Sequence, residues 1–437
     1  MRFCVLLSAV CVLSSSVASA QWLETTIPFT EAHWPSHVAY SPASNRVYTG
    51  GDDDSTYVID GATNLVVARL HVGEICEGFF YHPGADKLYR LNRFEQLDVI
   101  ACPLDSVVKR IRLPASYTAG MCYNTAGDKL YCTSKHTSEV IVVDCSSDEV
   151  VKQIPVGDSP EILCYNPTRN KAYVSHSDAS IAVVCGAGDT VLGNIYFSNR
   201  ASALCYNSVN DKVYCAAERG NLLVISGTDD TVVASLPVPA YTLCYDAASN
   251  KVYAGGRQRV AIIDAAADTV LSSVPVYGTS LLYNPMNNKV YCATWSYGWI
   301  AVIDGVGDTL LKEIQVPDGS YGTMAWNPVH NRVYAPFGGT AGSGVAVLRD
   351  SLLGVEEVTT GETRTAIWPT IVRGVLMLPQ STSSKRHVTS QLLDITGRKL
   401  MDLAPGDNDV SHLAPGSISC IRRQAWNVLR RASPGSL

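Results

Sequence analysis

A four-residue phrase recurs through this chain and constrains its fold more than any other feature. Asn-Lys-Val-Tyr stands at 250–253 and again at 288–291. Its tyrosine recurs, at intervals of 38 to 43 residues, as Tyr48, Tyr89, Tyr131, Tyr173, Tyr214, Tyr253, Tyr291 and Tyr334. Asn or Asp lies three residues before each of these tyrosines, and Lys or Arg follows that residue. A period near 40 residues predicts a repeat architecture.

Each repeat divides into four short strands. In one repeat the strand segments lie at 162–166, 171–175, 180–185 and 190–197. Val, Ile, Tyr and Thr dominate these segments, as is typical of strands, and no helical period appears. Four antiparallel strands in about 40 residues make the blade of a β-propeller. The chain is therefore expected to be all-β, with about eight four-stranded blades, or seven as the alternative.

The two ends of the repeat region indicate how the ring closes. The last repeat, which contains Tyr334, has three clear strands, and its fourth is weak. Residues 22–28, WLETTIP, resemble the fourth strands of other repeats. We therefore expect this N-terminal segment to complete the last blade, because closing the ring removes the open ends of the repeat array.

The repeat also resembles a known family. Residues 45–73, NRVYTGGDDDSTYVIDGATNLVVARLHVG, are similar to the unit of the YVTN-repeat, surface-layer-like β-propellers. The resemblance covers about residues 22–350. It implies the propeller fold and leaves the function open. The WD40 class of repeat is disfavoured, because the chain contains neither a Trp-Asp nor a Gly-His pair.

The first twenty residues predict a cleaved export signal. Arg2 precedes an apolar run of signal-peptide length, and residues 18–20 are the small residues that a signal peptidase requires. The mature chain would begin at Gln21 and be secreted or displayed on the cell surface. No later apolar run is long enough to span a bilayer. The net charge of −6 gives no basic field that would favour nucleic acid.

The repeat ends before the C-terminus. We expect a propeller over 21–352, a polar linker over 353–366 and a small β-sandwich-like domain over 367–437. That domain resembles the C-terminal sorting domains of type IX secretion cargo, through Leu393, Asp394, Gly397, Arg398 and the Leu-Ala-Pro-Gly at 413–416. The resemblance implies recognition by an export machinery. The end is atypical, since Ser-Ile-Ser-Cys at 417–420 replaces the family's aromatic pair, and a plain structural β-domain is the alternative.

The repeats differ most at one face of the ring. The turns between first and second strands, and between third and fourth strands, are uniform and share one face, here called the turn face. The loops between second and third strands and the links between blades vary and share the opposite face, here called the loop face. Because recognition needs different side chains at different places, the loop face is the expected binding face, with unconstrained drift as the alternative. The candidate binding residues are Trp34, Arg90, Arg93, His136, Arg219, Arg257, Arg259, Trp295, Tyr297 and Trp299.

No set of residues predicts catalysis, and no metal site or cofactor is expected. The Asp residues at the turns between third and fourth strands are interpreted as turn residues that bond their own backbone. A metal bridging His136 and His176 of adjacent repeats is a weaker alternative. Strand positions that carry a cysteine in some repeats carry small apolar residues in others, so we expect buried free thiols. Disulfides joining Cys122 to Cys132 and Cys205 to Cys215 are the alternative.

These features favour an exported, non-catalytic binding or surface-display protein whose partner is a protein, a peptide or a glycan. One alternative is a propeller enzyme resembling lactonases or quinoprotein dehydrogenases, with its chemistry at the ring centre. A structural surface-layer protein is the second alternative. The fold alone does not decide among these functions.

Overall fold

The computed structural model describes residues 21–29, 34–73, 75–115, 117–217, 219–294, 298–317, 319, 322–339 and 342–350, and the backbone of six strands between 370 and 426. The chain divides into two compact units, Met1–Glu356 and Glu357–Leu437. Among the described residues, no helical segment has the length and apolar character needed to cross a bilayer. The predicted export signal and the predicted linker lie outside the described residues.

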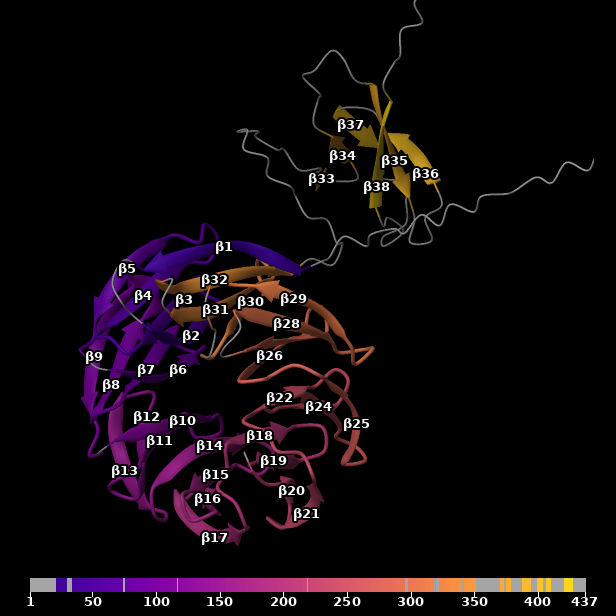
Figure 1. Ribbon diagram of the computed structural model, residues 1–437. Helices are drawn as coiled ribbons and strands as arrows, with labels where there is room; N and C mark the ends of the chain where they lie inside the picture. Colours follow the sequence, from indigo (N-terminus) through magenta and orange to yellow (C-terminus); the bar gives the residue numbers. More distant parts are fainter. Residues whose placement is uncertain are drawn as a thin grey trace, which may run out of the picture. The chain divides into compact units, whose positions relative to one another are not determined.

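The first unit is a ring of eight antiparallel four-stranded blades around a central axis (Figure 1). Blades 1 to 4 consist of β2 (Pro35–Ser41), β3 (Arg46–Gly51), β4 (Ser55–Asp60) and β5 (Val66–His71); β6 (Cys76–His82), β7 (Lys87–Asn92), β8 (Gln96–Ala101) and β9 (Ser106–Arg112); β10 (Thr118–Asn124), β11 (Lys129–Ser134), β12 (Glu139–Asp144) and β13 (Glu149–Pro155); and β14 (Pro160–Asn166), β15 (Lys171–His176), β16 (Ser180–Cys185) and β17 (Thr190–Tyr196).

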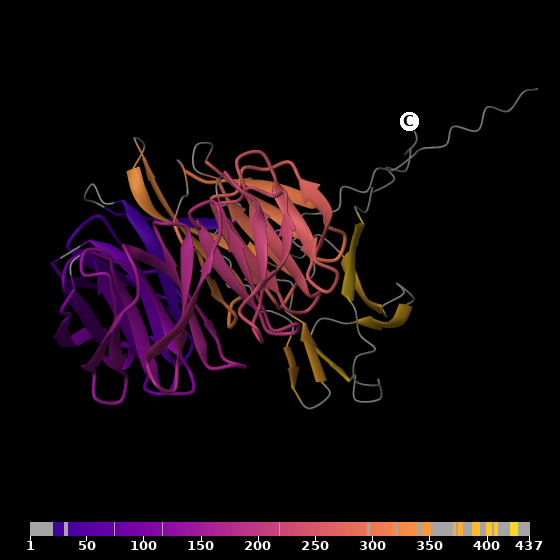
Figure 2. The same cartoon turned by 90° about the horizontal axis from the view of Figure 1, so that it is seen from below.

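Blades 5 to 8 repeat this order. They consist of β18 (Ala203–Asn207), β19 (Lys212–Ala216), β20 (Leu222–Ser226) and β21 (Val232–Leu236); β22 (Thr242–Asp246), β23 (Lys251–Gly255), β24 (Val260–Asp264) and β25 (Thr269–Val274); β26 (Ser280–Asn284), β27 (Lys289–Ala293), β28 (Trp299–Asp304) and β29 (Leu310–Gln315); and β30 (Ala325–Asn327), β31 (Arg332–Gly339), β32 (Gly342–Asp350) and β1 (Gln21–Phe29). The first strand of each blade lies nearest the axis, and the strands run through the thickness of the ring (Figure 2).

The N-terminal strand closes the ring, as predicted. β1 pairs antiparallel with β32, and in Figure 1 the indigo β1 lies along the orange β32. The Gln21 Nε2 donates to Asp350 Oδ1 at 2.9 Å, and the Arg332 guanidinium lies 2.6 Å from Glu24 Oε1. Eight blades are thereby complete, so the alternative of seven is wrong.

The Asn or Asp of the repeated phrase holds the turn between first and second strands. All eight residues at this position have left-handed backbone angles, with φ between 45° and 52°. Asn and Asp tolerate this conformation better than other residues with a side chain. In blade 4, for example, the Tyr165 hydroxyl also donates to Asn170 Oδ1 at 2.9 Å. The first residue of the phrase is therefore a local turn requirement.

The Lys and Tyr of the phrase form hydrogen bonds that connect each blade to the next one. Lys171 Nζ and the Tyr173 hydroxyl of blade 4 both lie 2.7 Å from the Asp230 carboxylate, which stands in the last turn of blade 5. All eight Lys or Arg residues of the phrase contact the following blade. Seven of them pair with a carboxylate there, which belongs to Asp105, Asp148, Asp189, Asp230, Asp268, Asp308 or Asp350. At the eighth junction the Arg332 guanidinium donates to the Gly61 carbonyl of blade 1, at 2.8 Å. The turn aspartates thus accept interblade hydrogen bonds, a role that the sequence interpretation did not foresee.

Apolar side chains fill the spaces between blades. Tyr131, Val140 and Val142 of blade 3 pack against Ala172 and Val174 of blade 4, and all five are buried. Similar clusters lie between the other blades. Burying one Val or Ile side chain stabilises a fold by roughly 1.5–3 kcal/mol, so the blade interfaces hold the ring together. The ring is a rigid frame on which the two faces differ.

The C-terminal unit contains six strands in two antiparallel sheets. β33 (Thr370–Val372), β34 (Val375–Leu378) and β37 (Gly406–Asp409) form one sheet, and β35 (His387–Leu393), β36 (Lys399–Leu403) and β38 (Cys420–Trp426) form the other. The predicted β-content is confirmed for these segments. The sandwich arrangement and the sorting role stay predictions.

Candidate binding surface

The loop face carries a compact aromatic and cationic cluster over blades 2 and 3. Tyr117, in the link between these blades, lies with its ring centroid 6.2 Å from Phe94 and 5.6 Å from His136. The Arg93 guanidinium and Lys135 Nζ lie 5.6 and 5.2 Å from the same centroid, within the range of cation–π attraction. Two predicted residues, Arg93 and His136, therefore meet at one tyrosine that sequence reasoning had not selected.

Ion pairs fix the basic side chains of this cluster. Arg93 Nε pairs with Glu77, and Glu161 accepts from Lys135 at 2.8 Å and from Arg200. Burial by itself raises the pKa of Glu161, but the hydrogen bonds from Arg200 and Lys135 outweigh it and leave that pKa below its usual value. These cations are already neutralised by carboxylates, so the cluster is preorganised and has little charge to offer a ligand.

A second sector of the loop face, over blades 5 and 6, is basic and differs in its pairing. Arg219, Arg257 and Arg259 are exposed there. Among the described residues, no carboxylate forms an ion pair with Arg219 or Arg259. The Arg257 Nε donates to the Tyr241 hydroxyl at 2.8 Å, and the ring of Tyr241 meets that of Tyr277 edge to face at 6.2 Å. We call these five residues the arginine sector.

The tryptophans of the candidate set flank the same face. Trp299 begins β28 and is 36% exposed, and it therefore belongs to blade 7, the blade that follows the arginine sector. Trp34 precedes β2 and is 46% exposed, and its carbonyl accepts from the Asp52 amide at 3.3 Å. Trp295 and Tyr297 lie outside the described residues.

Arg90 does not belong to this surface, contrary to the sequence prediction. Its side chain is fully buried within β7, opposite the fully buried Asp98 of β8, with 3.7 Å between the charged groups. Burial raises the pKa of Asp98 despite hydrogen bonds from Asn92 and Gln96, and burial together with the charge of Arg90 lowers the pKa of His37 to about 4. Other blades carry small or apolar residues where Arg90 stands, namely Thr49, Cys132, Val174, Cys215, Ala254, Cys292 and Ala335. In every repeat, the residue that directly follows the repeat tyrosine is buried. This shared position was the sequence signal that could have prevented the error.

His136 and His176 have different surroundings in the structure. His176 ends β15 and is buried, with its Nδ1 at 2.9 Å from the Ser180 hydroxyl. Burial lowers its pKa. His136 is exposed and packs on Tyr117, so the two imidazoles have different surroundings and different partners.

The described cysteines are free thiols, as expected. Eleven are present as such. In the β10–β11 pair, Met121 lies opposite Cys132 and Cys122 lies opposite Tyr131. Cys122 and Cys132 therefore project from opposite faces of the blade, since directly opposed residues share a face. The same register separates Cys205 from Cys215, so both disulfide alternatives are wrong.

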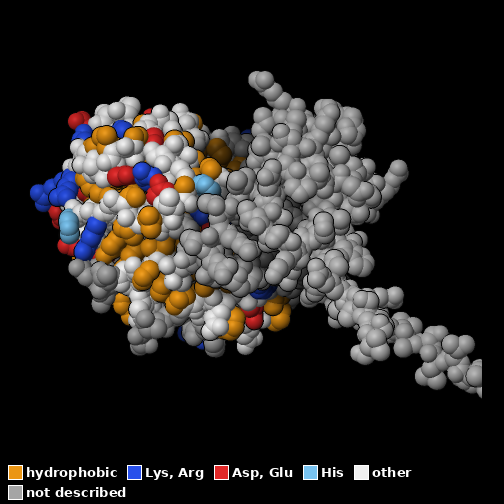
Figure 3. Space-filling model, turned by 90° about the horizontal axis from the view of Figure 1, so that it is seen from above, with side chains coloured by type: hydrophobic (Ala, Val, Ile, Leu, Met, Phe, Trp, Pro, Cys, Tyr) orange, Lys and Arg blue, Asp and Glu red, His pale blue; other side chains and the backbone are white. Residues whose placement is uncertain are grey.

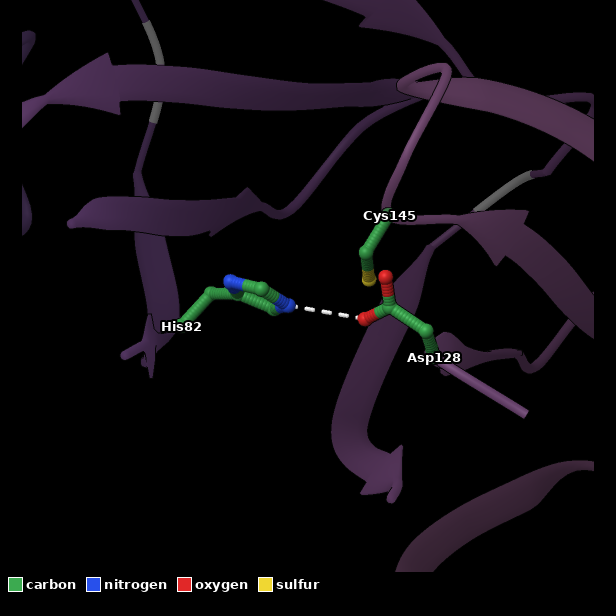
Figure 4. A group of neighbouring side chains, drawn as sticks. All are labelled: His82, Asp128 and Cys145. Carbon is green, nitrogen blue, oxygen red and sulfur yellow. Dashed lines mark hydrogen bonds and ion pairs between the residues drawn. The ribbon is translucent and has the colours of Figure 1, made fainter. Parts of the chain in front are cut away.

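His82, Asp128 and Cys145 come together on the turn face, between blades 2 and 3 (Figure 4). The sequence analysis did not select any of these three residues as a candidate. An alignment of the repeats by strand would have shown a His at the end of a first strand in blade 2, and an Asp and a Cys in the turns of blade 3.

The outer wall of the ring exposes scattered apolar side chains (Figure 3). They recur on the fourth strands of seven blades and include Val66, Val67, Val108, Val151, Leu192, Val232, Val233, Val270, Leu271, Leu310 and Leu311. Exposed apolar residues of this kind are normal on protein surfaces, so they do not identify a partner.

Comparison with known proteins agrees with the fold. No model of a known protein family matches the chain. The chain is 28% identical over 160 residues to the uncharacterized protein YncE of Salmonella typhi, and 27% identical over 160 residues to that of Salmonella typhimurium. Each match covers 35% of this chain and 45% of the relative, so the chain spans less than half the length of these curated relatives.

Solved structures are similar over most of the chain. The computationally designed Ika8 protein has a TM-score of 0.61 at 14% identity, covering 72% of this chain and 96% of its own. The C-terminal WD40 domain of Sif2 has a TM-score of 0.62 at 12% identity, covering 75% of this chain and 99% of its own. Identities this low show the fold alone. The strand order, the repeats and these similarities place the chain among the repeat β-propellers.

Proposed function

We propose that this protein is an exported, non-catalytic binding module that holds an acidic partner on the arginine sector of its loop face. The observation that carries the proposal is that two exposed arginines there, Arg219 and Arg259, form no ion pair with any carboxylate among the described residues. The turn face is occupied by interblade contacts, and the cations around Tyr117 are already neutralised. Export is inferred from the composition of residues 1–20.

The chemistry of the arginine sector fits an anionic protein, peptide or glycan. Guanidinium groups bind carboxylates and phosphates through paired hydrogen bonds, and they also stack on aromatic rings. Tyr241 and Tyr277, and Trp299 at the start of β28 in the next blade, supply such rings. Arg and aromatic side chains are also the residues that dominate binding energy at interfaces.

The test is capture of partners from the parent cell's envelope and medium by the mature chain, residues 21–437. One variant replaces Arg219, Arg257 and Arg259 with Ala. A matched control replaces three basic residues away from the loop-face sector, the exposed Lys152 and Arg169 and the half-buried Lys109, so that both variants lose the same charge.

We expect wild type and the control to retain an acidic partner that moderate salt releases, and the arginine-sector variant to bind it at least tenfold more weakly. Equal retention by both variants would refute the site assignment. Release insensitive to salt would refute the acidic character of the partner.

A further inference from the structure

Three side chains with metal-ligand chemistry converge at the junction of blades 2 and 3. His82 ends β6, Asp128 stands in the turn before β11, and Cys145 follows β12. The Nε2 of His82, a carboxylate oxygen of Asp128 and the Sγ of Cys145 all lie within 4.8 Å of one another. Figure 4 shows the imidazole and the thiol approaching the carboxylate from two sides, with His82 Nε2 at 2.7 Å from Asp128 Oδ1.

The other junctions show that this combination is particular to blades 2 and 3. The residue equivalent to His82 is Ser or Asp once each, and Asn in the remaining blades: Ser41, Asn124, Asn166, Asn207, Asp246, Asn284 and Asn327. Asn166, for example, donates to Asp211 of the next blade at 2.8 Å. An interblade hydrogen bond at this position therefore needs no imidazole.

The position of Cys145 carries a cysteine in one other described blade. Its equivalents are Gly61, Cys102, Gly186, Gly227, Ala265 and Gly305. Cys102, at the junction of blades 1 and 2, accompanies Asp86, but Ser41 occupies the place of the histidine there. Only the junction of blades 2 and 3, among those that the structure describes at all three positions, combines nitrogen, oxygen and sulfur ligands.

We propose that His82, Asp128 and Cys145 bind a divalent transition metal ion of the zinc class, which cross-links blade 2 to blade 3. Imidazole, carboxylate and thiolate are the ligands that zinc takes in proteins, and three protein ligands leave a fourth position for water. The Tyr123 hydroxyl donates to Asp128 Oδ1 at 2.8 Å and would orient that carboxylate from outside the metal's own ligands.

The positions of the ligand atoms must adjust when the ion binds. Ligand atoms about 2.0–2.1 Å from a tetrahedral zinc ion lie about 3.3 Å apart, so the distance between His82 Nε2 and Asp128 Oδ1 must widen from its present 2.7 Å. Asp128 can move, because it stands in a turn with a side chain that is 44% exposed. The same exposure gives the ion a path from solvent.

Two protonation changes accompany binding and limit its strength. Burial raises the pKa of the Cys145 thiol to about 12, so the metal must displace the thiol proton to solvent. The imidazole must carry its proton on Nδ1, for which the described residues provide no hydrogen-bond partner. The site therefore should bind metal less tightly than a preformed site with several thiolates.

The repeats themselves supply the test variants. His82→Asn installs the residue of five other blades and retains an interblade hydrogen bond, and Cys145→Ala installs the residue found at Ala265 in blade 6. His330→Asn, in the corresponding turn of blade 8, is the control for loss of a histidine. Metal-free mature chain is titrated with Co²⁺, and the thiolate-to-cobalt charge-transfer band is followed, with zinc binding measured by calorimetry.

Wild type and His330→Asn should bind one cobalt ion with a thiolate band, and zinc should raise their melting temperature. Cys145→Ala should lose the band, and His82→Asn should bind at least tenfold more weakly while unfolding normally without metal. Should His82→Asn misfold, His82→Ser, which reproduces the junction of blades 1 and 2, replaces it. A missing band in wild type, or equal binding by the variants, would overturn the proposal.

Discussion

Removing one buried tyrosine hydroxyl from the interblade hydrogen bonds should measure how much the repeated phrase contributes to the free energy of unfolding. Tyr173 and Tyr253 stand at the same position of two repeats, and both are fully buried. The Tyr173 hydroxyl donates to Asp230 at 2.7 Å, whereas the Tyr253 hydroxyl has no hydrogen-bond partner among the described residues. Tyr173→Phe therefore removes a hydrogen bond to a carboxylate, and Tyr253→Phe removes a buried polar atom alone.

The expected sizes follow from this difference. A hydrogen bond to a charged group contributes about 1.5–3 kcal/mol, and Lys171 still satisfies Asp230 in the variant, so Tyr173→Phe should cost about 1.5 kcal/mol. Tyr253→Phe should leave the free energy of unfolding unchanged or raise it slightly, because the variant no longer buries a hydroxyl without a hydrogen-bond partner. With an unfolding entropy of about 2.1 cal/mol/K per residue over roughly 330 residues, the first change lowers the melting temperature by about 2 °C.

The assay is reversible urea unfolding, followed by circular dichroism and by tyrosine fluorescence, with calorimetry for the melting temperature. Coincident transitions with the two probes are needed before free energies of unfolding are compared. Equal losses in the two variants, or a larger loss for Tyr253→Phe, would refute the view that the hydroxyl of the phrase stabilises the ring through the next blade.

Two further predictions concern buried and paired charges. Arg90→Ala should destabilise the ring by about 3 kcal/mol, because it removes the buried cation opposite Asp98 and leaves that carboxylate with Arg110 alone, at 3.6 Å and with a side chain that is 55% exposed. A double change to Cys and Ile, the pair found at Cys132 and Ile141, should cost far less; a urea double-mutant cycle measures the difference, and additive losses would contradict the prediction. Acid should remove the stabilisation that Glu161 provides, because the pKa of Glu161 is lowered in the folded state. This stabilisation is present above the unfolded pKa of about 4.5 and is lost as the pH falls through the folded pKa. The melting temperature of Glu161→Gln should therefore fall less than that of wild type between pH 6 and pH 3.

Local chemistry made much of the fold predictable. The left-handed turn at Asn170 and the antiparallel strands on either side of it depend on residues within one repeat, and such residues carry their preferences in the sequence. The match of residues 22–28 to a fourth strand was also enough to predict ring closure through β1.

Contacts between blades could not be predicted in the same way. Lys171 and Asp230 are 59 positions apart, and their meeting depends on how far one blade is rotated from the next. The same uncertainty affected Arg90, which a variable stretch of sequence appeared to place in a loop, although its strand register turns it into the core opposite Asp98.

By itself the sequence determined the repeat, the strand order, the turn residues and the segment that closes the ring, because each follows from the conformational preference of a short peptide or from the period of the pattern. The tertiary structure alone decided between eight blades and seven, and showed that Phe94, Arg93, Lys135 and His136 surround Tyr117. It also showed that no carboxylate among the described residues pairs with Arg219 or Arg259, and that His82, Asp128 and Cys145 meet. These features join residues from different blades, and their distances are set by the packing of whole sheets around the axis.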